Sequence, residues 1–93
     1  MTWTVHSSEG MSYTDQAAFV LMVENAIKRY GSSSNRSDVA EYVGEACQQE
    51  WPSSSEKWFV AYDTNVGWGY WAENVQKKMC VKEGDDYVYA IRH

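Results

Sequence analysis

Apolar residues recur at helical spacing along two stretches that precede Pro52. In the first stretch they are Phe19, Met22, Val23, Ala26, Ile27 and Tyr30. Ser12, followed three residues later by Asp15, is a helix-start signal, and Gly31 is placed to end a helix. The pattern therefore predicts an amphipathic helix that begins near Ser12 and ends at Tyr30.

The second stretch begins near Ser37 and Asp38, after a polar loop at 32–36. Its apolar stripe consists of Val39, Tyr42, Val43, Ala46 and Cys47, with Trp51 one turn further along. Pro52 ends this helix, because proline lacks the backbone N–H that continues the hydrogen-bond ladder. A second amphipathic helix is thus predicted to end before Pro52.

Runs of aromatic and β-branched residues predict the strands of the chain. These runs lie at 3–6, 58–62, 66–72, 76–83 and 87–91. The polar residues between successive runs, above all Gly84-Asp85-Asp86, are typical of turns. The order β-α-α-β-β-β-β predicts an α+β fold, in which both helices pack on one face of an antiparallel β-sheet.

The stretch at 58–72 carries three of the five tryptophans. Its second half contains Gly67 and Gly69, and glycine inside a strand often marks the close approach of another backbone. Two interpretations stay open at this point. Either the strand meets a partner chain, or its aromatic residues form the core of a small sheet.

The composition limits the chain to a single domain, residues 1–93, with a small core. Eight Lys and Arg against 13 Asp and Glu give a formal net charge of −5, the wrong sign for binding nucleic acid or inserting at an anionic membrane. The first residues lack the basic flank and apolar run of a signal peptide, which predicts a cytoplasmic protein. Cys47 and Cys80 lack Cys-x-x-Cys spacing and are expected to be reduced thiols in the core.

Motifs for catalysis or metal binding are weak in this sequence. The segment at 63–74 resembles a calcium loop, but Trp68 and Asn74 stand where that loop needs glycine and glutamate. His6 and His93 lie at opposite ends of the chain, without cysteine or carboxylate at metal spacing. Because no activated nucleophile is visible either, the sequence predicts neither an enzyme nor a bound metal or cofactor.

Three segments follow one another in an order that resembles a known family. They are Asp-Val-Ala-Glu-Tyr-Val at 38–43, the aromatic strand at 58–62, and Asn-Val-Gly at 65–67, all after a helix that ends at Tyr30. In this order they are similar to the dynein light chain type 1/2 family, over nearly the whole chain. A close subgroup forms the C-terminal domain of fluke tegumental calcium-binding proteins. The resemblance leaves open that this chain is such a domain, associated with the cytoskeleton or the tegument.

The resemblance implies a homodimer in which the strand at 66–71 crosses to the sheet of the partner. It also implies two grooves, each between a crossed strand and a second helix, where an extended peptide segment adds as a further strand by β-augmentation. The implied peptide-binding residues are Thr64, Asn65, Val66, Gly67, Trp68, Gly69, Tyr70 and Trp71, together with Ser37, Met79 and Val81. The implied dimer-interface residues are Phe59, Ala61, Val66, Trp68 and Tyr70.

The chain departs from the family pattern at the groove. Where the family has Ser-Tyr-Val-Thr-His after the shared glycine, this chain has Trp-Gly-Tyr-Trp-Ala at 68–72. Ser37 replaces a basic residue, and Phe59 replaces an interface histidine whose protonation separates the family's dimers. The expected function is a homodimeric peptide-binding module with an altered motif. Two alternatives stay open: a dimerisation domain whose groove no longer binds peptide, and an unrelated small-ligand binder that uses the tryptophans.

Overall fold

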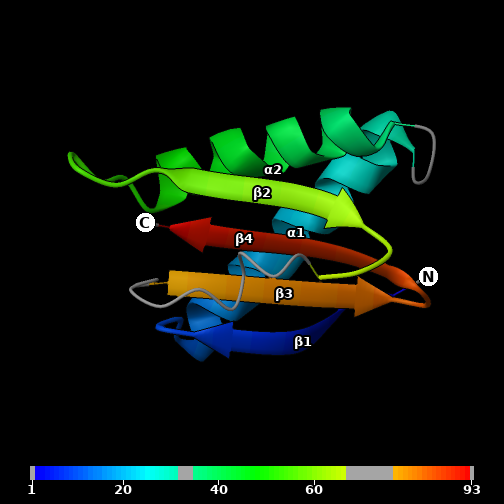
Figure 1. The fold of residues 1–93 in the computed structure, drawn as a ribbon, viewed down its shortest axis with the longest axis horizontal. Coiled ribbons are helices and arrows are strands. Elements are labelled where there is room, and N and C mark those ends of the chain that lie inside the picture. Colours follow the sequence, from blue (N-terminus) through cyan, green and yellow to red (C-terminus); the bar gives the residue numbers. More distant parts are fainter. Residues whose placement is uncertain (1, 32–34, 67–76, 93) are drawn as a thin grey trace.

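Two helices pack on one face of a four-stranded antiparallel sheet in the computed structural model of this protein (Figure 1). The structure describes residues 2–31, 35–66 and 77–92. Its elements, in chain order, are β1 (Thr4–Glu9), α1 (Tyr13–Tyr30), α2 (Arg36–Glu50), β2 (Trp58–Asp63), β3 (Lys77–Glu83) and β4 (Asp86–Arg92). The predicted α+β class, with two helices on one antiparallel sheet, is confirmed. The predicted strand at 66–72 lies, from residue 67 onward, outside the described residues.

The four strands are arranged in the order β1-β3-β4-β2, and every neighbouring pair is antiparallel. The β3–β4 hairpin turns at Gly84, whose φ of 59° is a conformation that glycine adopts without a Cβ clash. Within the described part of the chain, β1 and β2 are therefore the two edges of the sheet. The sheet brings the start of the chain and the segment after α2 to opposite edges.

Strand β1 is longer than the predicted strand at 3–6. It continues through Ser7 and Ser8, which pair with Cys80 and Met79 of β3 after a register shift that follows Val5. The polar residues were expected to break the strand, but they satisfy their backbone groups by pairing with β3 at the edge of the sheet. Backbone pairing with a neighbouring strand therefore extended β1 beyond its apolar run.

The ends of α1 follow the capping pattern that the sequence predicts. The backbone N–H of Asp15 donates to the Ser12 hydroxyl at 3.1 Å, and the N–H of Gly31 donates to the Ile27 carbonyl at 2.8 Å. Gly31 has a φ of 82°, which is why a glycine closes the helix. In contrast, Asn35 at the start of α2 makes no side-chain cap. Its side-chain amide donates instead to the Tyr30 carbonyl, which ties the end of α1 to the start of α2.

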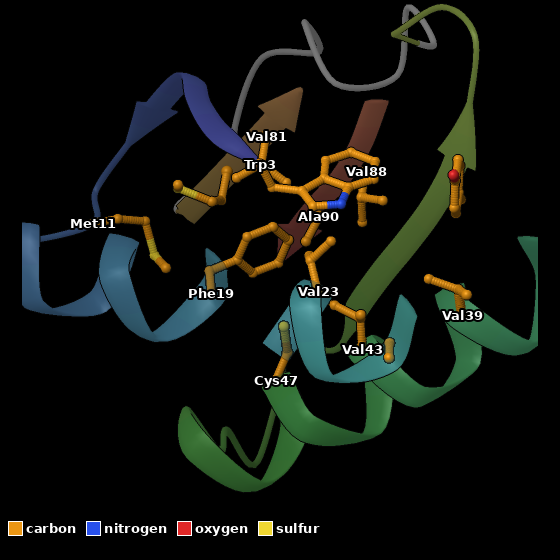
Figure 2. Packing of buried hydrophobic residues seen from close by; sticks show 13 residues of the cluster. Trp3, Met11, Phe19, Val23, Val39, Val43, Cys47, Val81, Val88 and Ala90 are labelled. Atoms are coloured by element: carbon orange, nitrogen blue, oxygen red, sulfur yellow. The ribbon is translucent and has the colours of Figure 1, made fainter. Parts of the chain in front are cut away.

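The core lies between the sheet and the two helices (Figure 2). Its buried residues on the helices are Phe19, Val23, Ala26, Val39, Val43 and Cys47. The sheet contributes Tyr62, Met79, Val81, Val88 and Ala90, and Trp3 enters from just before β1. The rings of Trp3 and Tyr62 meet edge to face, with 5.8 Å between their centroids. The two apolar helix stripes predicted from the sequence thus face the same sheet surface.

Candidate protein-interaction surface

Among the described strands, β2 forms one edge of the sheet, and it lies alongside α2 (Figure 1). Its side chains alternate between the two sheet faces, as a strand requires. Trp58, Val60 and Tyr62 pack into the core beneath the helices. Phe59 and Ala61 belong to the opposite face, and 54% of the Phe59 surface is exposed. An exposed phenylalanine on an edge strand is a feature that a partner chain can cover.

The sheet face away from the helices carries its own apolar cluster. Cys80, Tyr89 and Ile91 are buried in it, and Ala61, Val66 and Tyr87 pack against them. We call these six residues the second-face cluster. An antiparallel sheet that carries helices on one face usually has polar, solvent-exposed residues on the other face. The apolar character of both faces indicates that this sheet does not use its second face as a solvent-exposed surface.

The first turn of α2 is joined to β2 and β4 by three side chains. Arg36 Nη2 lies 3.0 Å from Asp86 Oδ1, and the Tyr62 hydroxyl donates to Asp86 Oδ2 at 3.0 Å. The Arg36 guanidinium also lies 4.7 Å from the centre of the Tyr62 ring. Burial, followed by the hydrogen bond to Asp86 and the charge of Asp86, raises the pKa of Tyr62 to about 12. These contacts fix α2 relative to the edge strand.

The other end of β2 is held by two tryptophans. The indole N–H of Trp58 donates to the Trp51 carbonyl at 3.2 Å, and the indole N–H of Trp51 donates to Asp15 Oδ1 at 3.1 Å. Their ring centroids are 5.5 Å apart. Arg92 reaches the same place, where its guanidinium lies 3.7 Å from a carboxylate oxygen of Glu56. Trp58 is thus partly buried and packs against the core, which agrees with the sheet-core interpretation for this one tryptophan of the stretch.

Several of the predicted site residues lie at or near the β2 edge. Thr64 and Asn65 are exposed directly after β2, and Val66 is half-buried against the second-face cluster. Ser37 is exposed in the first turn of α2, next to Arg36. The predicted residues Gly67, Trp68, Gly69, Tyr70 and Trp71 lie outside the described residues.

Met79 and Val81 are not positioned to bind a peptide. Both are fully buried between the sheet and the helices, on the face opposite to Cys80. Strand alternation predicted correctly that the two residues share a face, but the resemblance placed them in the groove. We therefore correct the prediction and assign both residues to the core.

The two cysteines are buried free thiols, as the sequence predicts. Burial raises the pKa of the Cys47 thiol and of the Cys80 thiol to about 12. Cys47 belongs to the core under α2, whereas Cys80 belongs to the second-face cluster. Both thiols thus stay protonated and inert at neutral pH.

His6, considered above as a possible ligand, packs edge-on against Tyr87 at 5.3 Å between ring centroids. His93 lies outside the described residues. Within the described ranges, no group of three His, Cys, Asp or Glu side chains comes together in a way that would hold a metal ion. The sequence analysis did not find the contact of Arg36 with Asp86, because residues 50 positions apart leave no local signal of their pairing.

Comparisons with known proteins add no family to this description. No protein-family model matches the chain, and a search of curated proteins finds no match. Among the described residues, neither helix is long and apolar enough to cross a membrane.

Proposed function

We propose that this protein is a homodimeric binding module of dynein light chain type, which captures extended peptide segments by strand addition beside β2. The observation that carries the proposal is the β2 edge, which lies beside α2, carries the half-exposed Phe59 on the sheet face away from the helices, and is covered by no further described strand. An edge strand offers backbone N–H and C=O groups to another extended chain. A helix beside that edge supplies one wall of a groove.

The close packing of α2 on β2 supports this arrangement. Gly44 of α2 faces Val60 of β2, and a Cβ built on Gly44 would lie 3.7 Å from Val60 Cγ2. The Arg36–Asp86 ion pair holds the first turn of α2 in place at one end. The helix and the strand thus form a rigid pair of elements, which reduces the ordering cost when a peptide binds.

An exposed side chain at the margin of the second sheet face supports the dimer. Cys80, Tyr89 and Ile91 are already buried within one chain, so the apolar surface that a second copy can cover on β2 is Phe59, which is 54% exposed. A two-fold contact uses the same patch on both copies, so Phe59 and Ala61 would meet their own counterparts or close neighbours. Two identical grooves then give bivalent binding, which raises the apparent affinity for a dimeric partner.

The proposal is tested by screening the protein against an array of extended peptides and titrating the hits by calorimetry. We expect hits that lack the family's usual glutamine motif. Ser37 brings no charge to the start of α2, and the neighbouring Arg36 is already paired with Asp86. A family peptide that contains glutamine should therefore bind at least about tenfold more weakly than the hits. Low-micromolar binding of that peptide would contradict the altered motif.

The sequence also predicts a block in the groove by Trp68 or Trp71, which replace small hydroxyl residues. Filling a pocket with a larger side chain costs roughly 1–3 kcal/mol. We therefore expect Trp71→Thr to improve binding of the family peptide, with Trp51→Phe as the control, because Trp51 belongs to the scaffold. No change for Trp71→Thr would show that this tryptophan does not fill the groove.

A second candidate function is dimerisation without peptide binding. The engagement of Arg36 by Asp86 favours it, because no described basic side chain is left free at the start of α2 to anchor a peptide. A stable dimer that gives no hit on the array would select this second function.

A further inference from the structure

The edge strand β2 has two ends that differ in charge. Helix α2 and strand β2 run in opposite directions (Figure 1). Arg36, at the start of α2, lies over the ring of Tyr62 near the end of β2. Trp51, directly after α2, packs against Trp58 at the start of β2. We call the two ends of this edge the Asp63 end, beside the first half of α2, and the Trp58 end, beside its last turn.

Exposed carboxylates gather at the Asp63 end. Asp63 pairs with the second residue of β4, which places it near the β3–β4 turn that holds Asp85. Glu41 lies about one helical turn before Gly44, the residue of α2 that faces Val60 of β2. The side chains of Glu41, Asp63 and Asp85 are exposed and form no ion pair with a described residue. Their charges are therefore available to a segment that lies beside the edge.

The described cations near this end do not offset these carboxylates. Arg36 is paired with Asp86 at 3.0 Å. Lys82 lies over the Tyr87 ring and belongs to β3, which β4 separates from the β2 edge. Asp38, in the first turn of α2, offsets the positive end of the helix dipole. Among the described residues, the Asp63 end thus keeps an excess of negative charge.

The Trp58 end carries charges of both signs. Lys57 is exposed directly before β2 and forms no ion pair with a described residue. Glu50, at the end of α2, is exposed and has the opposite charge. Glu56 is already paired with Arg92. A peptide beside β2 would therefore meet several carboxylates at one end of the edge and a mixed set of charges at the other.

The direction of the added strand decides which half of a peptide meets the carboxylates. Every neighbouring pair of strands in the described sheet is antiparallel. Antiparallel pairing is also slightly more stable per residue than parallel pairing. Because β2 runs from Trp58 to Asp63, an antiparallel peptide begins beside Asp63 and ends beside Trp58. Its N-terminal half then lies at the acidic end.

We propose that the segments which add to β2 carry lysine or arginine in their N-terminal half and bind in the antiparallel direction. This inference rests on the proposed strand addition at β2 and names the class of segment that the edge selects. Complementary charges set orientation and partner choice more than total affinity. The charges involved are exposed, so salt screens them, and the preference is strongest at low ionic strength.

The experiment is a two-dimensional NMR titration of the full ¹⁵N-labelled chain with three acetylated and amidated peptides. The lysine-first peptide is Lys-Lys-Thr-Val-Thr-Val-Glu-Glu, and the lysine-last peptide is Glu-Glu-Thr-Val-Thr-Val-Lys-Lys. The neutral peptide is Gln-Gln-Thr-Val-Thr-Val-Gln-Gln. The two charged peptides have the same composition and net charge, so a general attraction to an acidic protein cannot separate them.

The lysine-first peptide should bind at least about fivefold more tightly than the lysine-last peptide at about 50 mM salt. The difference should fall below about twofold at about 500 mM salt. Equal binding, or tighter binding of the lysine-last peptide, would overturn the charge preference. Strand addition would still stand in that case if the neutral peptide shifts the β2 amides. If none of the three peptides shifts these amides, both the strand addition and the charge preference fail.

Two carboxylate changes test the residues at the Asp63 end. Glu41→Gln combined with Asp63→Asn should reduce the preference below about twofold, because it removes two of the exposed charges. The asparagine keeps an oxygen that can accept the Thr64 N–H, as Asp63 does at 2.7 Å. Glu9→Gln removes an exposed carboxylate at the opposite edge, on β1, and should leave the preference unchanged. An unchanged preference in the double variant, or an equal loss with Glu9→Gln, would overturn the proposal.

A nitroxide at the N-terminus of the lysine-first peptide tests the direction of binding. We expect it to broaden the amide signals of Thr64 and Asn65, which follow β2, more strongly than the indole N–H signal of Trp58. Stronger broadening at Trp58 would show parallel addition and overturn the proposed direction. Circular dichroism of the double variant and of the Glu9→Gln control checks that both keep the fold.

Discussion

At the scale of single residues, the carboxylate of Asp86 joins two elements that are far apart in the sequence. It receives Arg36 from α2 and the Tyr62 hydroxyl from β2, each at 3.0 Å. Both charged side chains are about 30% exposed (30% and 27%), so solvent screens part of their attraction. We expect Arg36→Gln to lower the free energy of unfolding by about 1–2 kcal/mol, measured by urea denaturation.

The control for this prediction is Arg29→Gln, which removes the same charge from the end of α1. Arg29 lies over the Tyr30 ring and forms no ion pair with a described residue. It should change stability by less than about 0.5 kcal/mol. An equal loss for both arginines would mean that net charge, rather than the contact with Asp86, sets the stability.

Buried protonated side chains make the protein sensitive to alkali. The pKa values of Cys47 and Tyr62 in the folded protein are about 12, above their ordinary values of 9.0 and 10.0. The unfolded chain therefore loses these protons first as the pH rises, and the folded state becomes less favourable. Stability should be retained below about pH 9 and should fall progressively between about pH 9 and pH 12.

Urea denaturation at a series of pH values checks the alkaline prediction. Tyr62→Phe removes one titrating group and should flatten the decline above about pH 10, even though its stability at neutral pH is lower. A decline of unchanged slope in this variant would show that other groups control the alkaline loss.

At the scale of elements, two glycines with different backbones should respond in opposite ways to alanine. Gly44 lies inside α2, and its added Cβ would make an ordinary contact with Val60 at 3.7 Å. Because alanine favours the helix, Gly44→Ala should stabilise the protein by about 0.5–1 kcal/mol. Gly31 has a φ of 82°, so Gly31→Ala should destabilise it by about 1–3 kcal/mol.

Chemical denaturation of both variants measures this pair. A destabilising Gly44→Ala would contradict the prediction and show that the added methyl group strains the contact between α2 and Val60 of β2. Both outcomes bear on the proposed groove, because Gly44 lies on α2, the helix that would form one of its walls.

The elements themselves were largely predictable from the sequence. The helical period found both helices, and Ser12 and Gly31 placed the ends of α1 within a residue or two, because caps are local signals. Strand β1 extended past its apolar run, since pairing with β3 satisfies its polar residues. The face occupied by Met79 and Val81 was not predictable, because alternation shows which residues share a face but not which face the helices cover.

At the scale of the whole molecule, the arrangement of the candidate sites depends on distant pairs. The contact between Arg36 and Asp86 joins segments 50 residues apart, and the pairing of Asp63 with Tyr87 places the end of β2 beside the β3–β4 turn. Neither leaves a periodic or local pattern in the sequence. The sequence therefore predicted the aromatic strand at 58–62. The residues that surround this strand come from distant segments, and only the three-dimensional structure shows which ones they are.

The proposed dimer should tolerate mild acid. Phe59 stands at the position where the resembling family has an interface histidine, and phenylalanine does not titrate. The dimer should therefore persist between about pH 7 and pH 5, the range in which an ordinary histidine gains its charge. Size-exclusion chromatography with light scattering across this range checks the prediction. Dissociation with a midpoint near about pH 6 would show that a group other than residue 59, such as His6, acts as the switch.

Sedimentation equilibrium at micromolar concentration tests the proposed homodimer most directly. The expected mass is twice the 10.7 kDa of one chain. Phe59→Asp should shift the protein to the monomer, because it places a charge on the exposed apolar position of β2. Leu21→Asp changes an equally exposed apolar residue on α1 and should leave the dimer intact. A wild-type chain that sediments at 10.7 kDa would contradict both the homodimer and the groove beside β2.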